Sequence, residues 1–130
     1  MADIKSKINQ IKRFEFYFGN PFCGIRKVNI YFGEDYRVMS NALNKKNTPR
    51  QGKLIKELRT IDFDNWKEEY SIPNPNSDNA WTINLTFEGE LITFRGIDCY
   101  PNDWFKILDF LDNIGEFDIE KMMMDGEYDE

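Results

Sequence analysis

The segment of residues 81–115 (WTINLTFEGELITFRGIDCYPNDWFKILDFLDNIG) constrains the fold more than any other part of the chain. Apolar and polar residues alternate strictly over residues 81–87, which predicts a half-buried strand. A Glu-Gly-Glu turn follows, and residues 91–95 are predicted to return as the hairpin partner of that strand. Pro101 then begins a helix with a broad apolar stripe, and Gly115 is placed to end it. A hairpin followed by an amphipathic helix indicates an α+β unit.

Shorter patterns before this segment predict three further strands. Phe14, Phe16 and Phe18 alternate with other residues at the period of a strand. Residues 25–32, with Val28, Ile30 and Phe32 on one face, predict a second strand, and residues 36–39 predict a third. Turn residues separate these segments, so the three strands together predict an antiparallel meander. Residues 40–47 are polar and predict a loop.

Cap residues and helical spacing predict the other helices. Thr48 and Gln51 fit a capping box, so a helix is expected over residues 49–60. Asp64 is expected to cap a second short helix that runs through residue 70. Residues 2–12 predict a short helix or a frayed arm, with its isoleucines on one face.

Together these segments predict an α+β fold: an antiparallel sheet of about five strands, with two main helices packed on one face. The 130 residues are expected to form a single domain over residues 1–115, followed by an acidic C-terminal tail over residues 116–130. Aromatic residues make up 15% of the chain, whereas disordered chains are poor in them, so most of the chain should fold.

The net charge of −6 is concentrated at the C-terminal end. Residues 116–130 contain seven acids and one base, and the rest of the chain has sixteen of each. Within that neutral remainder, one acid, Glu57, stands among six bases: Lys45, Lys46, Arg50, Lys53, Lys56 and Arg59. This asymmetry predicts a charged partner or a tail that covers a basic surface.

The absence of histidine excludes most of the common catalytic systems. It removes histidine acid–base catalysis, Ser-His-Asp and Cys-His nucleophiles, and histidine-ligated zinc. Cys23 and Cys99 are too few for a four-thiolate metal site and are typical of reduced thiols in the cytoplasm, although their pairing stays open. The chain has no long apolar run, and its first residues lack the apolar segment of a secretory leader, so neither a membrane span nor secretion is expected. We therefore expect a cytoplasmic protein without metal, cofactor, catalytic residues or membrane partner.

Aromatic and cationic residues around the hairpin form one candidate site. Arg95 beside Gly96 could bind an anion, although pairing with a nearby acid is the favoured role. The tryptophans could stack on bases or sugars, although core packing is the favoured explanation for them. Gly96 itself allows a bulge or a close backbone approach. The predicted pocket residues are Trp81, Arg95, Tyr100 and Trp104.

Carboxylates and the basic cluster are weaker candidates. Asp62, Asp64, Asp98 and Asp103 could hold Mg²⁺ or act as a glycosidase pair, but two of them sit at predicted helix starts, where capping is the simpler role. The basic residues 45–59 could touch nucleic-acid phosphates. They lack interleaved aromatic residues and lie on a polar helix face, so direct nucleic-acid binding is not favoured.

Residues 78–104 (DNAWTINLTFEGELITFRGIDCYPNDW) resemble small uncharacterised proteins of Firmicutes and their phages or mobile elements. In those proteins a D-G-x-x-W strand is followed by a hairpin, then by G-x-N-x-Y-P-x-x-W and a closing helix. Here Asn79 and Asp98 replace the usual Gly and Asn. The resemblance covers roughly the last third of the chain and, loosely, residues 14–32. It implies an α+β fold in which Tyr100-Pro101 leads into a docking helix, and it implies no activity.

Two classes of function fit these observations. The first is a non-enzymatic module that binds a protein, for example a phage or mobile-element inhibitor of a host defence nuclease (anti-CRISPR-like). It would occupy the groove of a basic nucleic-acid-binding partner with its acidic side chains, namely Glu116, Asp118, Asp125, Glu127, Asp129 and Glu130. The alternative is a small-ligand or immunity-type binding domain with the aromatic pocket. A carboxylate metal enzyme ranks third and would require the acids to meet in one cleft. The oligomeric state stays open.

Overall fold

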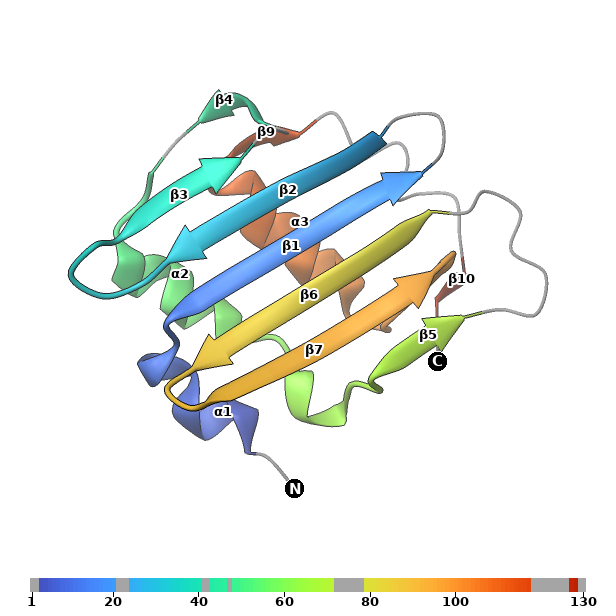
Figure 1. Cartoon of the computed structure of the whole chain (residues 1–130), viewed down its shortest axis with the longest axis horizontal. Coiled ribbons are helices and arrows are strands. Elements are labelled where there is room, and N and C mark those ends of the chain that lie inside the picture. The colour runs from blue at the N-terminus through green and yellow to red at the C-terminus, as the bar shows by residue number, and fades with distance from the viewer. Residues whose placement is uncertain are drawn as a thin grey trace.

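A six-stranded sheet forms the centre of the computed structural model, with strand order β3-β2-β1-β6-β7-β5 (Figure 1). Every neighbouring pair is antiparallel except β5 and β7, which run parallel. The structure describes residues 3–20, 24–40, 43–46, 48–71, 79–117 and 127–128. The sheet strands are β1 (Arg13–Asn20), β2 (Gly24–Tyr31), β3 (Arg37–Ser40), β5 (Glu69–Ser71), β6 (Ala80–Phe87) and β7 (Glu90–Ile97).

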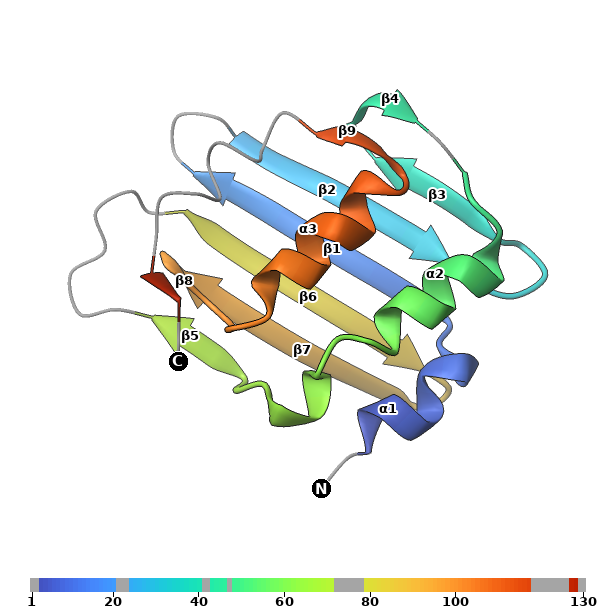
Figure 2. The same ribbon diagram turned by 180° about the vertical axis from the view of Figure 1, so that it is seen from behind.

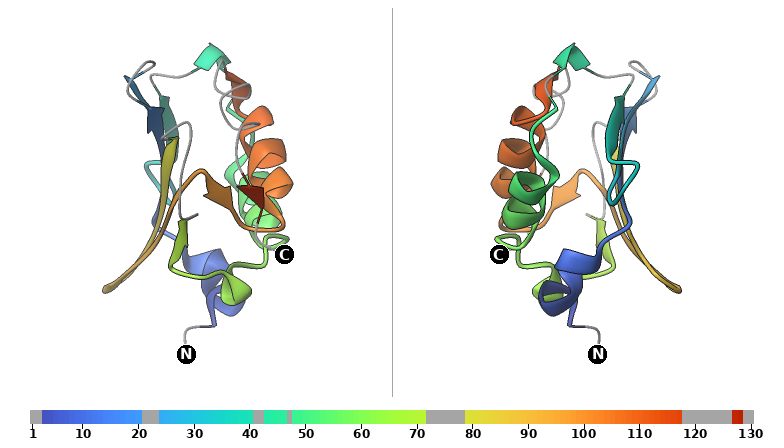
Figure 3. Two further views of the ribbon diagram at one scale, coloured as in Figure 1. Left: turned by 90° about the vertical axis from the view of Figure 1, so that its right-hand side faces the viewer. Right: turned by 90° about the vertical axis from the view of Figure 1, so that its left-hand side faces the viewer.

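All described helices lie on one face of this sheet (Figures 2 and 3). They are α1 (Ile4–Lys7), η1 (Ile8–Gln10), α2 (Gln51–Leu58), η2 (Phe63–Asn65) and α3 (Trp104–Asp112). None of them has the length and apolar character needed to cross a bilayer. The predicted α+β class, with helices packed on one face of an antiparallel sheet, is therefore confirmed, and the sheet has one strand more than expected.

Two short strand pairs lie beside the main sheet. β4 (Leu43–Lys46) pairs with β9 (Gly115–Phe117), and β8 (Cys99–Tyr100) pairs with β10 (Glu127–Tyr128). The first pair joins the predicted loop 40–47 to the start of the predicted tail. Strand β9 thus brings the first residues of the acidic segment into the fold.

The core follows from the alternation along the strands. Phe14, Phe16 and Phe18 are completely buried, and so are their cross-strand partners Ile83 and Leu85 on β6. Helix α3 covers this layer with its own aromatic rings. The ring of Phe110 lies 5.0 Å from that of Phe14, and the ring of Trp104 lies 6.1 Å from that of Phe16.

The predicted close approach at Gly96 is confirmed. A Cβ atom at this position would lie 2.4 Å from Nε1 of Trp81 and 2.7 Å from the carbonyl oxygen of Cys99. The same indole nitrogen donates a hydrogen bond of 2.8 Å to that carbonyl. Only a residue without a side chain lets the Trp81 ring pass over β7 to reach its acceptor.

Four local predictions were wrong, because long-range partners replaced the expected local ones. Residues 43–46 form β4 instead of a loop, and residues 69–71 form β5 instead of continuing a helix. No side chain caps α2 from its N-cap residue, and Gln51 instead bonds the backbone of Gly33, with its Oε1 2.9 Å from the amide nitrogen. Asp64 accepts from the amides of Ile4 and Lys5 at 2.6 and 3.1 Å, so it holds the start of α1.

Candidate functional site

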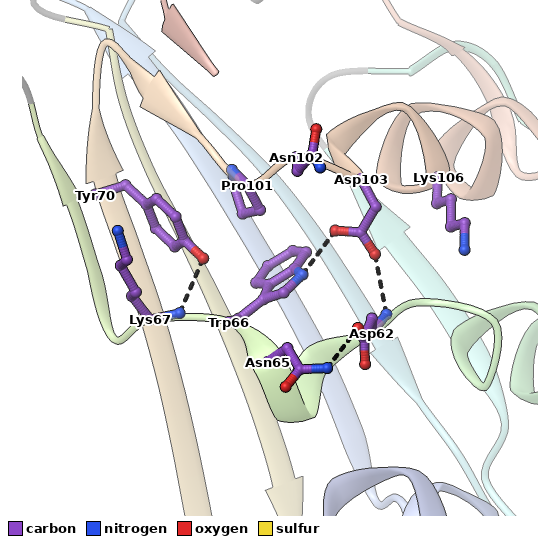
Figure 4. Close-up of a pocket in the computed structure, with 9 residues that line it drawn as sticks. All are labelled: Asp62, Asn65, Trp66, Lys67, Tyr70, Pro101, Asn102, Asp103 and Lys106. Atoms are coloured by element: carbon purple, nitrogen blue, oxygen red, sulfur yellow. Dashed lines mark hydrogen bonds between the residues drawn. The ribbon is translucent and has the colours of Figure 1, made fainter. Parts of the chain in front are cut away.

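A polar pocket of about 490 Å³ lies where η2, the start of β5 and the N-terminal end of α3 meet. Figure 4 shows Trp66 between Tyr70 on one side and Asp103 on the other. Nine residues line the pocket: Asp62, Asn65, Trp66, Lys67, Tyr70, Pro101, Asn102, Asp103 and Lys106. They come from two segments, residues 62–70 and 101–106, that are some forty residues apart in the chain. The tertiary structure brings these segments together, and hydrogen bonds to Asp103 join them.

Asp103 fixes the geometry of this pocket. Its Oδ1 accepts a hydrogen bond of 2.8 Å from Nε1 of Trp66, and its Oδ2 accepts one of 3.0 Å from the amide of Asp62. Helix α3 begins at Trp104 and not at the predicted Pro101, so Asp103 stands at its N-cap position, but the expected capping hydrogen bond to its own helix is not formed. The carboxylate therefore ties two segments together and stays at the pocket wall.

The other polar groups of the pocket are held in similar ways. Nδ2 of Asn65 donates to Oδ2 of Asp62 at 2.7 Å, and the amide of Lys67 donates to the hydroxyl of Tyr70 at 2.9 Å. On the far side, Nζ of Lys106 donates to the carbonyl of Thr60 at 2.7 Å. Two carboxylates and two ammonium groups line the pocket, so that its charges cancel.

The structure does not bring the four predicted pocket residues into one cavity. Trp81, Tyr100 and Trp104 are at most 1% exposed and pack on each other in the core, with ring centroids 4.7 Å apart for Trp81–Trp104 and 5.1 Å for Tyr100–Trp104. Arg95 precedes Gly96, which pairs with Trp81, so Arg95 points to the opposite face of the sheet. Trp81 and Arg95 do border one shallow hollow of about 370 Å³ next to β5.

The four carboxylates that were the weakest candidate site do not meet in one cleft. Asp64 binds the start of α1, and Asp98 is 2% exposed and accepts from the amide of Asn79 at 3.1 Å. Asp62 and Asp103 do meet at the pocket, but within the described ranges no group of three acidic, cysteine or histidine residues could hold a metal ion. This part of the chain thus offers no support for the metal-enzyme hypothesis.

Most of the predicted acidic contact residues lie outside the described residues. These are Asp118, Asp125, Asp129 and Glu130, and Cys23 and the three consecutive methionines at 122–124 lie outside them too. Glu116 lies in β9 and Glu127 in β10, where the backbone alone is described. In the β4–β9 register, Glu116 stands opposite Lys45 of the basic cluster. The acidic segment therefore begins beside the basic one.

The second candidate surface is the open face of the sheet, which no described helix covers (Figure 3). The open face is formed by the residues that alternate with the core residues, from Arg37, Met39 and Ile25 across to Leu91, Arg95 and Ile97. Tyr31 lies between Arg37 and Arg13, whose guanidinium carbons are 4.0 and 4.8 Å from the ring centroid. Such contacts stabilise a cation over an aromatic ring.

Further polar contacts join the centre of the open face. Arg13 forms an ion pair of 3.2 Å with Glu15 and donates to Oδ1 of Asn29 at 3.2 Å. The hydroxyl of Tyr17 donates to Glu15. This hydrogen bond to a carboxylate, together with burial, raises the pKa of Tyr17 above its ordinary value.

Large apolar side chains surround this polar centre. Ile25, Met39, Leu91 and Ile97 are 62, 52, 61 and 43% exposed, and each points to the open face. Sequence analysis did not single out this surface. The sequence pattern that defines this surface was nevertheless present. The alternation that places Phe14, Phe16 and Phe18 on the buried face of the sheet also places the residues between them on the open face.

No protein-family model, no curated protein and no solved structure matches the chain. The resemblance of residues 78–104 to small proteins of Firmicutes and mobile elements stays a prediction. The pocket and the open face are the two surfaces on which we base functional proposals.

Proposed function

We propose that the protein is a non-enzymatic module that binds another protein through the open face of its sheet. One observation carries this proposal. Four of the five exposed large apolar side chains among the described residues lie on this face, and the fifth, Phe105, lies on α3. These four side chains stand around the polar centre of the open face, so a partner that covers the face would bury all of them, and removing apolar area from water favours association.

The charge of the open face favours an acidic partner surface. Its strands present four cations (Arg13, Lys27, Arg37 and Arg95) and two acids (Glu15 and Glu69), although the whole chain has a net charge of −6. Complementary charge steers association and makes it sensitive to salt. A partner that places apolar side chains against Met39 and Leu91 and acids near Arg37 would match both properties.

A protein fits this face better than a single-stranded nucleic acid. Proteins that bind single strands offer aromatic rings on which bases stack. Here guanidinium groups flank Tyr31, and Tyr17 is engaged with Glu15. The apolar side chains at the margin also have no counterpart in a phosphate backbone.

Substitutions on the open face test this proposal. The full-length protein serves as bait in a bacterial lysate, and a protein captured reproducibly is purified for affinity measurements. Met39→Asp and Leu91→Asp together remove apolar contacts and add charges that repel an acidic partner, so we expect affinity to fall at least about tenfold, or 1.4 kcal/mol. Phe105→Asp is the matched control, because Phe105 is equally exposed at 58% but lies on α3.

The control also defines the opposite outcome. If Phe105→Asp weakens binding while the Met39 and Leu91 substitutions leave it unchanged, the contact surface is on the helical side. Circular dichroism must show that all variants remain folded. A captured nucleic acid that competes with the protein partner would argue for a different class of function.

A narrower function rests on the acidic segment and on a basic groove of the partner, and not on the acidic partner surface that the open face favours. According to this narrower proposal, the protein inhibits a host defence nuclease, as anti-CRISPR proteins do. Its acidic side chains would occupy the groove in which the nuclease binds nucleic acid. The charge of residues 116–130 and the resemblance to mobile-element proteins support it. Carboxylates can occupy sites that otherwise bind phosphates, and such contacts weaken with salt.

Truncation tests the narrower function. Deletion of residues 118–130 leaves β9 in place and removes β10 together with six acids and one base, which is most of the net charge of −6. We expect inhibition of the nuclease to weaken, and raised salt to weaken the inhibition by the full-length protein in the same direction. Full inhibition by the truncated protein would reject the acidic segment as the inhibitory element and leave the open face as the contact surface.

A further inference from the structure

We propose that the pocket between η2, β5 and α3 binds a neutral saccharide. This site is separate from the open face, because its aromatic and proline residues belong to the helix-covered side of the sheet (Figure 4). It also differs in composition from the predicted pocket around Trp81 and Trp104, which is part of the core. Three properties of its lining point to a saccharide.

The first property is that both carboxylates are already held in place. Asp103 is fixed by hydrogen bonds of 2.8 and 3.0 Å from Trp66 and from the amide of Asp62, and Asn65 holds the side chain of Asp62 at 2.7 Å. Each carboxylate oxygen has lone pairs for a second donor. Oriented acceptors of this kind bind hydroxyl groups at low cost in conformational entropy.

The second property is the balance of charge. Asp62 and Asp103 are matched by Lys67 and Lys106, so the pocket favours neither a cation nor an anion by net charge. A phosphate would meet two carboxylates, and a divalent cation would meet two ammonium groups and too few acidic ligands. A neutral ligand with many hydroxyl groups can use the donors and the acceptors together, because a hydroxyl both donates and accepts.

The third property is an aromatic surface beside these polar groups. Trp66 is half-buried, and its position is set by the hydrogen bond to Asp103 and by an edge contact with Phe63 at 4.8 Å. Tyr70 and Pro101 are buried and complete the apolar part of the lining. The negative face of an aromatic ring attracts the weakly positive C–H groups of a sugar ring. The volume of about 490 Å³ is within the range for small ligands.

NMR titration of the full-length protein tests the proposal directly, because the indole N–H of Trp66 reports on the site. The probes are a panel of neutral mono- and disaccharides, with glycine as a zwitterionic probe and inorganic phosphate as an anionic probe. We expect at least one saccharide to move the Trp66 indole signal saturably, with a Kd of about 1–10 mM, as is usual for a ligand of that size. The indole signal of Trp81 is the internal control, because it is buried and bonded to Cys99.

Variants locate the binding. Asp62→Ala and Asn102→Ala remove exposed polar groups of the pocket, and each should raise the Kd about fivefold or more, the effect of one or two hydrogen bonds. Asp109→Ala removes an exposed acid of α3 that does not line the pocket, and it should leave the Kd unchanged. If the Asp62→Ala variant does not fold, the Kd of the Asn102→Ala variant still tests whether the saccharide binds in this pocket.

Three results would overturn the proposal. No saccharide in the panel moves the Trp66 signal, or glycine or phosphate moves it while no saccharide does, or Asp109→Ala weakens binding as much as Asn102→Ala. None of these results affects the open face, so a failure here leaves the proposed protein-binding function standing.

Discussion

The two faces of the sheet are made by the same strands and differ in almost every physical property. On β1, Phe14, Phe16 and Phe18 point inward and are completely buried under α3. Arg13, Glu15 and Tyr17 alternate with them and form ion-pair and hydrogen-bond contacts on the open face. The inner face depends on burial of apolar area, and the open face depends on polar and cation–aromatic contacts within β1 and between neighbouring strands.

Because of this difference, the inner face mainly determines the stability of the fold, and the open face is available for recognition of a partner. Burial of aromatic side chains contributes several kcal/mol each, whereas exposed ion pairs and cation–aromatic contacts contribute about 1 kcal/mol or less. The open face can therefore change its side chains with little effect on the fold. Substitutions on the inner face should therefore change the free energy of unfolding, and substitutions on the open face should change the affinity for a partner.

The largest contrast is expected between adjacent residues of β1. Phe16→Ala empties a completely buried site, so the free energy of unfolding should fall by about 3–5 kcal/mol. Tyr17→Ala changes a half-buried residue of the open face and should cost about 1 kcal/mol or less. Urea denaturation followed by circular dichroism measures both. Equal losses would contradict the assignment of the two faces.

The second contrast compares two glycines. Gly96→Ala places a methyl group against Trp81 and the backbone of Cys99, so we expect a loss of about 2–4 kcal/mol in the free energy of unfolding. Gly52→Ala is the matched control in α2, where a Cβ atom meets nothing within 4 Å, and it should stabilise the protein by about 0.5–1 kcal/mol. A tolerated Gly96→Ala would show that Trp81 does not need this close approach.

The smallest contrast concerns the pKa of tyrosines. Glu15 raises the pKa of Tyr17 through their hydrogen bond, so Glu15→Gln should lower the Tyr17 pKa toward its ordinary value. Tyr36 has a pKa raised by burial alone, and it should not respond. NMR titration of the ring signals at alkaline pH resolves the two. An equal shift of both tyrosines would indicate a change of conformation instead of the loss of one contact.

The sign of the linked stability change follows from the raised pKa. The folded state holds the Tyr17 proton more tightly than the unfolded state does. The stability that Tyr17 contributes through this raised pKa is complete below the ordinary pKa of tyrosine. It is lost as the pH rises through the raised pKa. Wild type should therefore lose stability more steeply than Glu15→Gln in this alkaline range.

Much of the fold could be predicted from periodic patterns. The alternation at Phe14–Phe18 and over residues 81–87 specified β1 and β6, because a period of two puts every second side chain on the buried face. The apolar stripe after Pro101 specified α3 in the same way, with a period of 3.6. These patterns are local, so a single sequence contains all the information they need.

The candidate sites could be predicted only in part. The signal for the open face was in the sequence, but whether a helix covers that face depends on how the whole chain packs. The pocket depended on a carboxylate, Asp103, whose partners Trp66 and Asp62 are about forty residues away in the chain. No local pattern indicates which distant amide a carboxylate will bind.

By itself, the sequence determined which residues are buried along each long strand and helix, and it excluded histidine chemistry. Only the tertiary structure decided that residues 43–46 and 69–71 become strands, that Gln51 and Asp64 bind distant backbone groups, and that three predicted pocket residues are core. The physical reason is that burial follows a periodic pattern that one segment carries alone. A hydrogen bond from a short polar segment instead goes to whichever unpaired group packing brings within reach.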